Sequence, residues 1–424
     1  MRFACLDDWL NWQTSHHPSA IDLGLARVAE VATRLGLQQA AARARVLTIA
    51  GTNGKGSAVA TLESLMLTLD QSVGAYTSPH LHRYNERIRV NGVEADDGLI
   101  CRAFDAIDQA AGDISLTYFE FGTLAALWIF AQLNLSVWVL EVGLGGRLDA
   151  VNIVDPDAAL VTSIGLDHQD WLGDDLEGIG REKAGIFRPE QVAIYMDAEP
   201  VASVRALADT LGTSLWVVGT ELALIEQGKQ IRVKAPDIAL TIARPALPLP
   251  SVVGACLLAH RLGFALPQSW LEVTLPALQL SGRHQHVLIS GRTLLLDVAH
   301  NPAACRFFLQ KAGQAQGTAA VKQIVLAMMA DKDTEAVLSV LATAGKVQLH
   351  LAALPENPRA ATPGQLAAQA QGLGFAQIQS HASVAEALNA CLRDHEATGD
   401  IWVLGSFFTV AAAQDWLHNS GVRG

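Results

Sequence analysis

Short apolar segments of the strand type alternate with helical segments along most of this chain, and this alternation constrains its fold more than any other feature. In the first half the apolar segments are Val46–Ala50, Val73–Tyr76, Val137–Val142 and Ala159–Ile164. Short, continuously apolar strands separated by helices are typical of a parallel sheet that is covered on both faces. Ligands of such sheets bind beyond the carboxyl ends of the strands, so we expect the functional residues directly after each strand.

The alternation is interrupted in the middle of the chain and then resumes. The less regular part contains candidate strands at Ser214–Val218, Gln230–Val233 and Ile238–Ile242, followed by the proline-rich segment Pro245–Pro250. Helical segments run to about Leu280, and Ser281-Gly282-Arg283 is interpreted as a linker. A second series of strands follows at Thr293–Val298, Gln323–Met328, Val347–Leu351 and Ile401–Leu404. We therefore expect a larger α/β domain at residues 1–282 and a smaller α/β domain at residues 283–424.

The charge balance argues against a nucleic-acid partner. The 424 residues contain 42 acidic and 30 basic side chains, which gives a net charge of −12. A face that binds the phosphate backbone normally appears as an excess of Lys and Arg. A local basic pocket for a small anion remains compatible with this composition.

Neither membrane insertion nor secretion is expected. Phe121–Leu140 is uncharged and long enough for a membrane span, but polar residues interrupt it and its end is β-branched and aromatic. We interpret it as a buried helix followed by a buried strand. Met1–Trp12 lacks the apolar segment of a signal peptide, and the scattered cysteines suggest buried free thiols, so we expect a cytoplasmic protein. The cysteines are Cys5, Cys101, Cys256, Cys305 and Cys391.

A glycine-rich loop follows the first strong strand and precedes the helical segment Ala58–Leu69. Its sequence is Gly51-Thr52-Asn53-Gly54-Lys55-Gly56-Ser57. Such a loop can direct backbone N–H groups and a helix N-terminus at phosphate oxygens, and Lys55 would reach the β- and γ-phosphates. The strict Walker pattern is not met, because position 49 is Ile and Gly56 separates Lys55 from Ser57. The alternative is a strand-to-helix turn with a solvated lysine.

Three further polar side chains, Ser78, Glu141 and His168, each follow a predicted strand. Hydroxyl and carboxylate oxygens suit Mg²⁺, whereas histidine is a less usual ligand, so composition alone leaves the metal open. Taken singly, the three could equally be a turn serine, an exposed acid and a loop histidine.

The chain resembles the Mur-type ATP-dependent amide ligases, and among them the folylpolyglutamate synthase/dihydrofolate synthase family. The similarity rests on many motifs in the family's order, of which the glycine-rich loop is the first. The others are Ile21-Asp22-Leu23-Gly24-Leu25, Thr77-Ser78-Pro79-His80-Leu81, Tyr84-Asn85-Glu86-Arg87-Ile88, Leu116-Thr117-Tyr118-Phe119-Glu120-Phe121, Glu141-Val142-Gly143-Leu144-Gly145-Gly146-Arg147-Leu148-Asp149, Leu166-Asp167-His168, Arg181-Glu182-Lys183-Ala184-Gly185-Ile186, Asp297-Val298-Ala299-His300-Asn301-Pro302, Asp331-Lys332-Asp333 and Gly405-Ser406-Phe407.

The resemblance implies a fold and a reaction. The fold would be a P-loop parallel-sheet ATPase domain of the Mur-ligase type, followed by a smaller Rossmann-like α/β domain. ATP would phosphorylate a carboxylate of the acceptor, and the amine of L-glutamate would then displace phosphate from the acyl phosphate. The transferring group would be stabilised by Lys55, Mg²⁺ and the helix dipole. The protein would act as a monomer.

The resemblance also assigns roles around the metal. Ser78 and Glu141 would hold one Mg²⁺ on the nucleotide phosphates, and His168 would hold a second. Lys183 would be carbamylated, which converts a cation into an anionic oxygen ligand and requires the neutral amine. His168 and the carbamate would serve the electrostatics of the amine attack. A surface lysine on an amphipathic helix is the alternative for Lys183.

The second domain would supply the rest of the nucleotide and glutamate sites. By the same resemblance Asp297 would contact the ribose, Arg283 the ATP phosphates, and His300 the glutamate or phosphate end. Nucleotide contacts on both domains would require closure during turnover. A capped helix N-terminus and a solvated linker arginine are the alternatives.

Two positions depart from the family pattern. Leu249-Pro250-Ser251-Val252-Val253 stands where relatives show Pro-Asn-Ala, so the Asn beside adenine is missing. Ser281 replaces the usual Pro before Gly282-Arg283.

The acceptor pocket carried over from bifunctional bacterial relatives would bind a pterin. Tyr118 and Phe119 suit stacking on a flat heteroaromatic ring, although packing in the core is the alternative. We expect dihydropteroate and reduced folates as acceptors; a synthase restricted to folates, a cell-wall Mur ligase and a nucleotide-hydrolysing switch are alternatives. The pocket would comprise Asp22, Leu23, Gly24, Leu25, Thr117, Tyr118, Phe119, Glu120, Leu148, Asp149 and Ala150.

Overall fold

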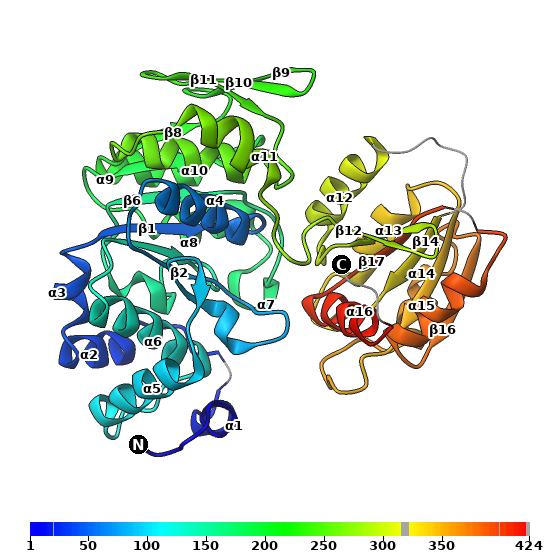
Figure 1. Cartoon of the computed structure of the whole chain (residues 1–424), viewed down its shortest axis with the longest axis horizontal. Helices are drawn as coiled ribbons and strands as arrows, with labels where there is room; N and C mark the ends of the chain where they lie inside the picture. The colour runs from blue at the N-terminus through cyan, green and yellow to red at the C-terminus, as the bar shows by residue number, and fades with distance from the viewer. Residues whose placement is uncertain (20, 315–321, 398, 421–424) are drawn as a thin grey trace. The chain divides into compact units, whose positions relative to one another are not determined.

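The computed structural model describes residues 1–19, 21–314, 322–397 and 399–420. The chain divides into two compact units, Met1–Leu278 and Gln279–Gly424 (Figure 1). This boundary lies just before the Ser281-Gly282-Arg283 segment.

An eight-stranded sheet forms the centre of the N-terminal unit, in the order β4-β3-β2-β5-β1-β6-β7-β8 (Figure 1). Six neighbouring strands from β2 to β8 are parallel, and β3 and β4 extend one edge in antiparallel pairing. Because β1 lies between β5 and β6, the segment after β1 is flanked by the carboxyl ends of both neighbours. The strands are β1 Arg45–Ala50, β2 Val73–Tyr76, β3 Ile88–Val90, β4 Val93–Glu94, β5 Val137–Glu141, β6 Ala158–Val161, β7 Val192–Tyr195 and β8 Ser214–Val217.

Helices cover this sheet and bury its apolar strands. The stretch 121–140 forms most of helix α6 and then β5, as expected. No helix in the described part of the chain is long and apolar enough to cross a membrane. The helices are α1 Leu6–His16, α2 Ala26–Arg34, α3 Leu37–Ala41, α4 Lys55–Thr68, η1 Tyr84–Arg87, α5 Asp97–Ala111, α6 Tyr118–Gln132, η2 Ala150–Ile153, α7 Gln169–Leu172, α8 Leu176–Ala184, α9 Ala202–Leu211, α10 Leu249–Arg261, η3 Trp270–Thr274 and α11 Leu275–Ala277.

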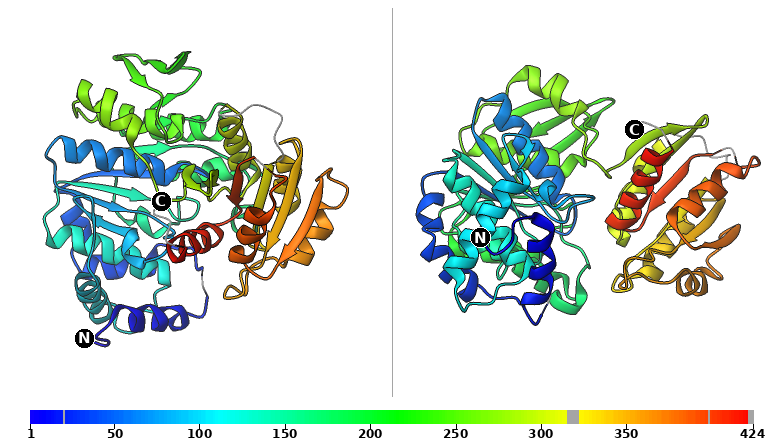
Figure 2. Two further views of the ribbon diagram at one scale, coloured as in Figure 1. Left: turned by 45° about the vertical axis from the view of Figure 1, so that its right-hand side comes forward. Right: turned by 60° about the horizontal axis from the view of Figure 1, so that its bottom comes forward.

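A small antiparallel sheet, drawn in green in Figures 1 and 2, belongs to the same unit. It consists of β9 Ala223–Gln227, β10 Gln230–Lys234 and β11 Ala239–Ala243. In β10, Ile231 and Val233 are buried while the residues between them are exposed, the alternation of a sheet with one solvated face.

The C-terminal unit is built on a six-stranded sheet in the order β12-β13-β17-β14-β15-β16, with helices on both faces (Figure 2). All its neighbours pair in parallel except β12 and β13. Side chains of α12, α13 and α14 form the core on one face. The elements are β12 Gln285–Ile289, β13 Arg292–Leu296, α12 Pro302–Gln314, β14 Lys322–Leu326, α13 Thr334–Ala342, β15 Val347–Ala352, α14 Pro363–Ala370, β16 Gln377–His381, α15 Val384–Arg393, β17 Ile401–Leu404 and α16 Phe407–Asn419.

The predicted α/β fold is confirmed, but several elements were missed. The strands β3, β4, β7, β9, β12 and β16 were not expected. Most are short or lie near a sheet edge, and β16 is polar and largely exposed, so its sequence lacks the apolar signal of a buried strand. The expectation of five buried cysteines was wrong for Cys5, which is exposed just before α1, while the other four are buried free thiols.

Candidate functional site

The glycine-rich loop turns directly from β1 into α4, as its position in the sequence predicted. Gly54 has a left-handed backbone (φ 84°), and a side chain at Gly51 would overlap the hydroxyl of Thr162. Lys55 is the first residue of α4, and its Nζ donates to the carbonyl oxygens of Gly51 (2.9 Å) and Thr52 (3.3 Å). The lysine therefore curls over the loop at a helix N-terminus, the arrangement that suits a phosphate.

Residues after β6 hold this loop from outside. The backbone N–H of Thr52 donates to the carbonyl oxygen of Ser163 (2.8 Å), and that of Asn53 donates to Ser163 Oγ (3.0 Å). Thr162 Oγ1 donates to the carbonyl oxygen of Asn53 at 2.6 Å. The loop conformation is thus set by contacts far away in sequence.

Ser251, in the segment that departs from the expected family pattern, packs on the glycine-rich loop. Ser251 is only 2% exposed on α10, and a side chain at Gly54 would overlap its Oγ. The departure from the family pattern therefore adjoins the glycine-rich loop itself.

Pairing of β2 with β5 brings Ser78 and Glu141 together. Glu141 is the last residue of β5 and is 4% exposed, and Ser78 lies two residues beyond β2. The backbone N–H of Ser78 donates to Glu141 Oε2 at 3.3 Å. His168 lies on the exposed loop after β6, where it precedes the short helix α7 with a left-handed backbone (φ 53°). No group of three or more His, Cys, Asp and Glu side chains among the described residues is arranged to hold a metal by itself.

Lys183 is buried rather than solvated, contrary to the surface alternative. It lies on α8 and is 5% exposed. Burial, reinforced by the positive charge of Lys55, lowers the pKa of Lys183 to about 7, whereas Asp167 and Asp149 act in the opposite direction. Lys183 therefore belongs to the same charged cluster as Lys55, and a large fraction of its amine is neutral near pH 7.

The Gly143–Asp149 loop is what holds the backbone of Lys183. A side chain at Gly146 would lie 2.7 Å from the carbonyl oxygen of Glu182 and 2.9 Å from that of Lys183. The N–H of Arg147 donates to the carbonyl oxygen of Glu182 at 2.8 Å. The glycine thus permits a close backbone approach that a larger residue would prevent.

Asp149 shapes this loop from inside. Its carboxylate accepts hydrogen bonds from the backbone N–H groups of Gly143 (3.0 Å), Leu144 (2.8 Å) and Val151 (2.9 Å). Burial raises the pKa of Asp149 to about 6 despite these bonds. Leu148 beside it is half-buried, and Ala150 is buried in the core at the start of η2.

The remaining acceptor segments meet through an arginine that the sequence analysis overlooked. Arg27 Nη1 pairs with Asp22 Oδ2 (2.8 Å) and Nη2 with Glu120 Oε1 (3.1 Å). Glu120 also forms a capping box with Thr117 at the start of α6. Arg27 stands two residues beyond the Ile21–Leu25 motif, so its proximity to that motif was the available signal. Asp22 is exposed, and Leu23, Gly24 and Leu25 are half-buried.

The aromatic pair Tyr118 and Phe119 connects these segments to the end of β5. The Phe119 ring centroid lies 6.1 Å from that of Tyr76, and a side chain at Gly143 would come 2.5 Å from the Phe119 ring. Tyr118 contacts Tyr84 edge to face at 5.6 Å. Two of the predicted acceptor segments, around Tyr118–Phe119 and Asp149, therefore adjoin the end of β5 that carries Glu141, and the Asp22 segment is linked to them through Arg27.

In the C-terminal unit, Arg283, Asp297 and His300 gather beyond the carboxyl end of β13. The Arg283 guanidinium lies 5.1 Å from the centroid of the Phe407 ring, and the His300 ring lies 6.5 Å from it. Asp297 accepts from the backbone N–H of His284 (2.8 Å). Burial raises the pKa of Asp297, and the charge of Arg283 opposes this shift. The sequence analysis named Phe407 only as part of a motif. Its contacts with Arg283 and His300 are evident only in the structure.

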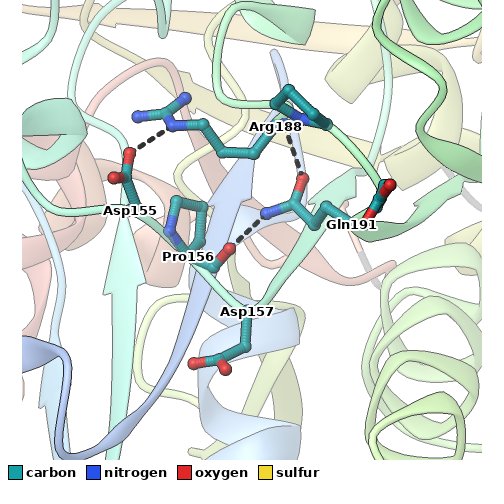
Figure 3. A pocket seen from close by; sticks show the side chains of 7 residues that line it. Asp155, Pro156, Asp157, Arg188 and Gln191 are labelled. Carbon is teal, nitrogen blue, oxygen red and sulfur yellow. Dashed lines mark hydrogen bonds and ion pairs between the residues drawn. The ribbon is translucent and has the colours of Figure 1, made fainter.

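A different charged group lies at the opposite, amino edge of the large sheet. An open pocket of about 340 Å³ is lined there by Asp155, Pro156, Asp157, Arg188, Pro189, Glu190 and Gln191 (Figure 3). These residues precede β6 and β7, and none of the predicted site residues is among them.

Comparison with known proteins agrees with the geometry. The Mur ligase middle domain matches residues 49–243, and the Mur ligase glutamate ligase domain matches residues 282–407. The dihydrofolate synthase/folylpolyglutamate synthase of Escherichia coli is 42% identical over 96% of this chain and 94% of its own length; that of Haemophilus influenzae is 33% identical over 96% of both.

Solved structures agree over the same extent. Escherichia coli FolC in complex with DHPP and ADP superposes with a TM-score of 0.92 at 39% identity, covering 99% of both chains. The Yersinia pestis bifunctional folylpolyglutamate synthase/dihydrofolate synthase with AMPPNP and Mn has a TM-score of 0.90 at 39% identity, covering 98% of both. With the glycine-rich loop, the Ser78–Glu141 contact and the buried Lys183 in place, the chain belongs to the dihydrofolate synthase/folylpolyglutamate synthase family of Mur-type ligases.

Proposed function

We propose that this protein joins L-glutamate to dihydropteroate and to reduced folates at the expense of ATP. The observation that carries the proposal is the meeting of the glycine-rich loop, Glu141 and two of the acceptor segments at one sheet edge, in a chain 42% identical to a bifunctional synthase over almost its full length. The relatives solved with ADP and DHPP, and with Mn, AMPPNP and L-glutamate, support the same substrates.

The reaction proceeds in two displacements. A carboxylate oxygen of the acceptor attacks the γ-phosphorus of ATP, and ADP leaves. The amine of glutamate then attacks the acyl carbon, phosphate leaves, and the amine proton passes to solvent. Lys55 and the N-terminus of α4 stabilise the negative charge of the transferring phosphoryl group.

The donor set fits Mg²⁺ bound together with a nucleotide. Glu141 and Ser78 offer a buried carboxylate and a hydroxyl within the same small region. Mg²⁺ commonly binds with one or two such protein oxygens, and phosphate oxygens and water complete its coordination. When bound, the ion supplies positive charge that neutralises the phosphates. We assign a second ion to His168 and the modified Lys183.

Carbamylation of Lys183 is part of the proposal. The neutral amine adds to CO₂ and releases a proton, and the lowered pKa of Lys183 makes this form available near pH 7. Protein depleted of CO₂ should lose turnover and recover it with bicarbonate, together with a carbamate signal from ¹³C-bicarbonate by NMR. Unchanged turnover without CO₂ would refute the modification.

The acceptor range is tested by ADP release with ATP, Mg²⁺ and L-glutamate. Turnover with both dihydropteroate and tetrahydrofolate is expected. Turnover with tetrahydrofolate alone would remove the dihydrofolate synthase activity, and no turnover with either would refute the function. We further propose that the protein acts as a monomer in the cytoplasm, which sedimentation and cell fractionation would test.

A further inference from the structure

Arg87 occupies the space between the predicted metal ligands and the acceptor segments. It is the last residue of η1, immediately before β3, and it is half-buried. Its carbonyl oxygen accepts from the backbone N–H of Thr77 at 2.9 Å, and Thr77 precedes Ser78. On the other side, its guanidinium lies 5.4 Å from the ring centroid of Tyr118. Arg87 therefore connects the Ser78 turn, through its backbone, with the start of α6, through its side chain.

The guanidinium is held in place without being neutralised. It lies 5.4 Å from the Tyr84 ring as well, and its Nε donates to His80 Nδ1 at 2.8 Å. In this bond His80 Nδ1 is the acceptor, so this ring nitrogen carries no proton. Two aromatic faces and one imidazole nitrogen orient the guanidinium, and none of the three contributes a carboxylate.

The neighbouring arginines of the same segment, unlike Arg87, form ion pairs with carboxylates. Arg89 pairs with Glu63 at 2.8 Å, and Arg83 pairs with Glu94 at 3.8 Å. Across the described ranges Arg87 forms no ion pair with a carboxylate, and no protein group accepts a hydrogen bond from its terminal nitrogens. Such a half-buried, oriented guanidinium is suited to an anion that binds by two parallel hydrogen bonds.

We propose that the terminal nitrogens of Arg87 bind the acceptor carboxylate that becomes phosphorylated. This inference rests on the proposed function, since it identifies the group that receives the pterin acceptor's anionic end. The aromatic ring of the acceptor would lie along Tyr118 and Phe119, and its carboxylate would point toward the Ser78 turn. Arg87 is thus a binding residue for the reacting group rather than for the pterin ring.

The experiment measures how much the carboxylate contributes to the binding affinity of the acceptor. Dihydropteroate is compared with the same dihydropterin bearing an aniline that lacks the carboxylate, by isothermal titration calorimetry with ADP and Mg²⁺ present. The wild-type protein should bind dihydropteroate about ten to a hundred times more tightly than the analogue. In R87Q the two affinities should become nearly equal, while the affinity for the analogue stays unchanged.

Two further variants keep the test decisive. R83Q removes an exposed arginine of the same segment and should retain the wild-type ratio of affinities. R87K keeps the cation beside the tyrosine rings but not the two parallel donors, so its ratio should fall between those of wild type and R87Q. If R87Q proves unstable, an unchanged ratio in R87K overturns the assignment.

The other outcomes also decide the question. An equal loss for both ligands in R87Q would mean that Arg87 contacts the pterin ring, which contradicts the proposal. An unchanged ratio would exclude any role in binding the carboxylate. If the wild-type protein bound neither ligand and released no ADP, the proposed function itself would fail; normal wild-type turnover with an unaltered R87Q ratio would overturn only the role of Arg87.

Discussion

The two edges of the large sheet both carry charged side chains, but they satisfy those charges differently. At the amino edge, Arg188 donates to Asp155 (Figure 3). It also donates to Asn152 Oδ1 (2.9 Å) and to backbone carbonyl oxygens. At the carboxyl edge, Lys183 is buried close enough to Lys55 for the two charges to oppose each other, and its pKa is lowered.

This contrast separates a structural cluster from a functional one. A half-buried cation such as Arg188, whose nitrogens already donate to a carboxylate, an amide oxygen and backbone carbonyls, contributes to the fold and has little capacity left for a ligand. The charged form of Lys183, buried and repelled by Lys55, costs free energy, and conversion of its amine to a carbamate would remove that positive charge. The following predictions test this contrast, beginning with the largest expected effect.

Substitution of Lys55 should abolish most of the activity. In Lys55→Ala we expect kcat for ADP release to fall about a hundred- to a thousandfold, because the positive charge that stabilises the transferring phosphoryl group is lost. The melting temperature should fall much less than the activity, since the substitution also removes the repulsion between Lys55 and the buried Lys183. A fall of less than tenfold would contradict a phosphate role for this loop.

The pH dependence of stability should report the buried Lys183. In CO₂-free buffer its pKa is about 7 when folded and about 10.4 when unfolded, so between these values the unfolded state binds the extra proton. The free energy of unfolding should therefore rise with pH across this window, by a contribution on the order of 4 kcal/mol, and carry its full penalty below pH 7.

Lys183→Met removes this contribution. Urea unfolding at several pH values should show the variant more stable than wild type near pH 6.5, with the advantage shrinking toward pH 10. Parallel pH curves for the two proteins would show that Lys183 ionises normally and would weaken the distinction between the two edges.

At the amino edge, loss of a hydrogen-bonding group should affect stability alone. Gln191 is buried, donates to the carbonyl oxygen of Pro156 (2.6 Å) and accepts from the Arg188 N–H (3.1 Å). Gln191→Ala should lower the free energy of unfolding by about 1–3 kcal/mol, because both partners lose a bond. ADP release measured well below the melting temperature should stay within twofold; a large drop would mean that this edge also serves catalysis.

The smallest effect is expected at Glu190 in the same pocket. Its backbone is left-handed (φ 59°), which is unfavourable for a residue with a side chain. In Glu190→Gly, relief of this conformation is offset by the greater freedom of glycine in the unfolded chain. Denaturant unfolding should change by less than about 1 kcal/mol and turnover should not change. A larger loss of either would reveal a role for the Glu190 carboxylate.

The order of elements and the loop residues were predictable because they depend on local signals. The apolar run of β1 followed by glycines and Lys55 predicts a strand, a phosphate-type turn and a helix without knowledge of the rest of the chain. The proximity of Ser78 to Glu141 was also predictable, since parallel strands bring their carboxyl ends to one edge. Edge strands such as β16 were not, because a solvated strand carries no apolar pattern.

The electrostatic character of the site could not be read in the same way. Lys183 lies on a helix beside Glu182, a pattern typical of a solvated surface, and only packing under the Gly143–Asp149 loop buries it. Arg27 was overlooked because its partners, Asp22 and Glu120, lie on segments that meet only in the folded chain. Arg87 likewise appeared only as one letter of a motif.

The sequence by itself determined the α/β class, the glycine-rich loop with Lys55, and the identity of most side chains at the site, because each depends on neighbouring residues and on apolar periodicity. The tertiary structure decided which charges are buried, which are paired and which stay uncompensated. Those properties depend on the distance to groups tens or hundreds of residues away and on the exclusion of water, and both arise only when the strands and their loops pack together.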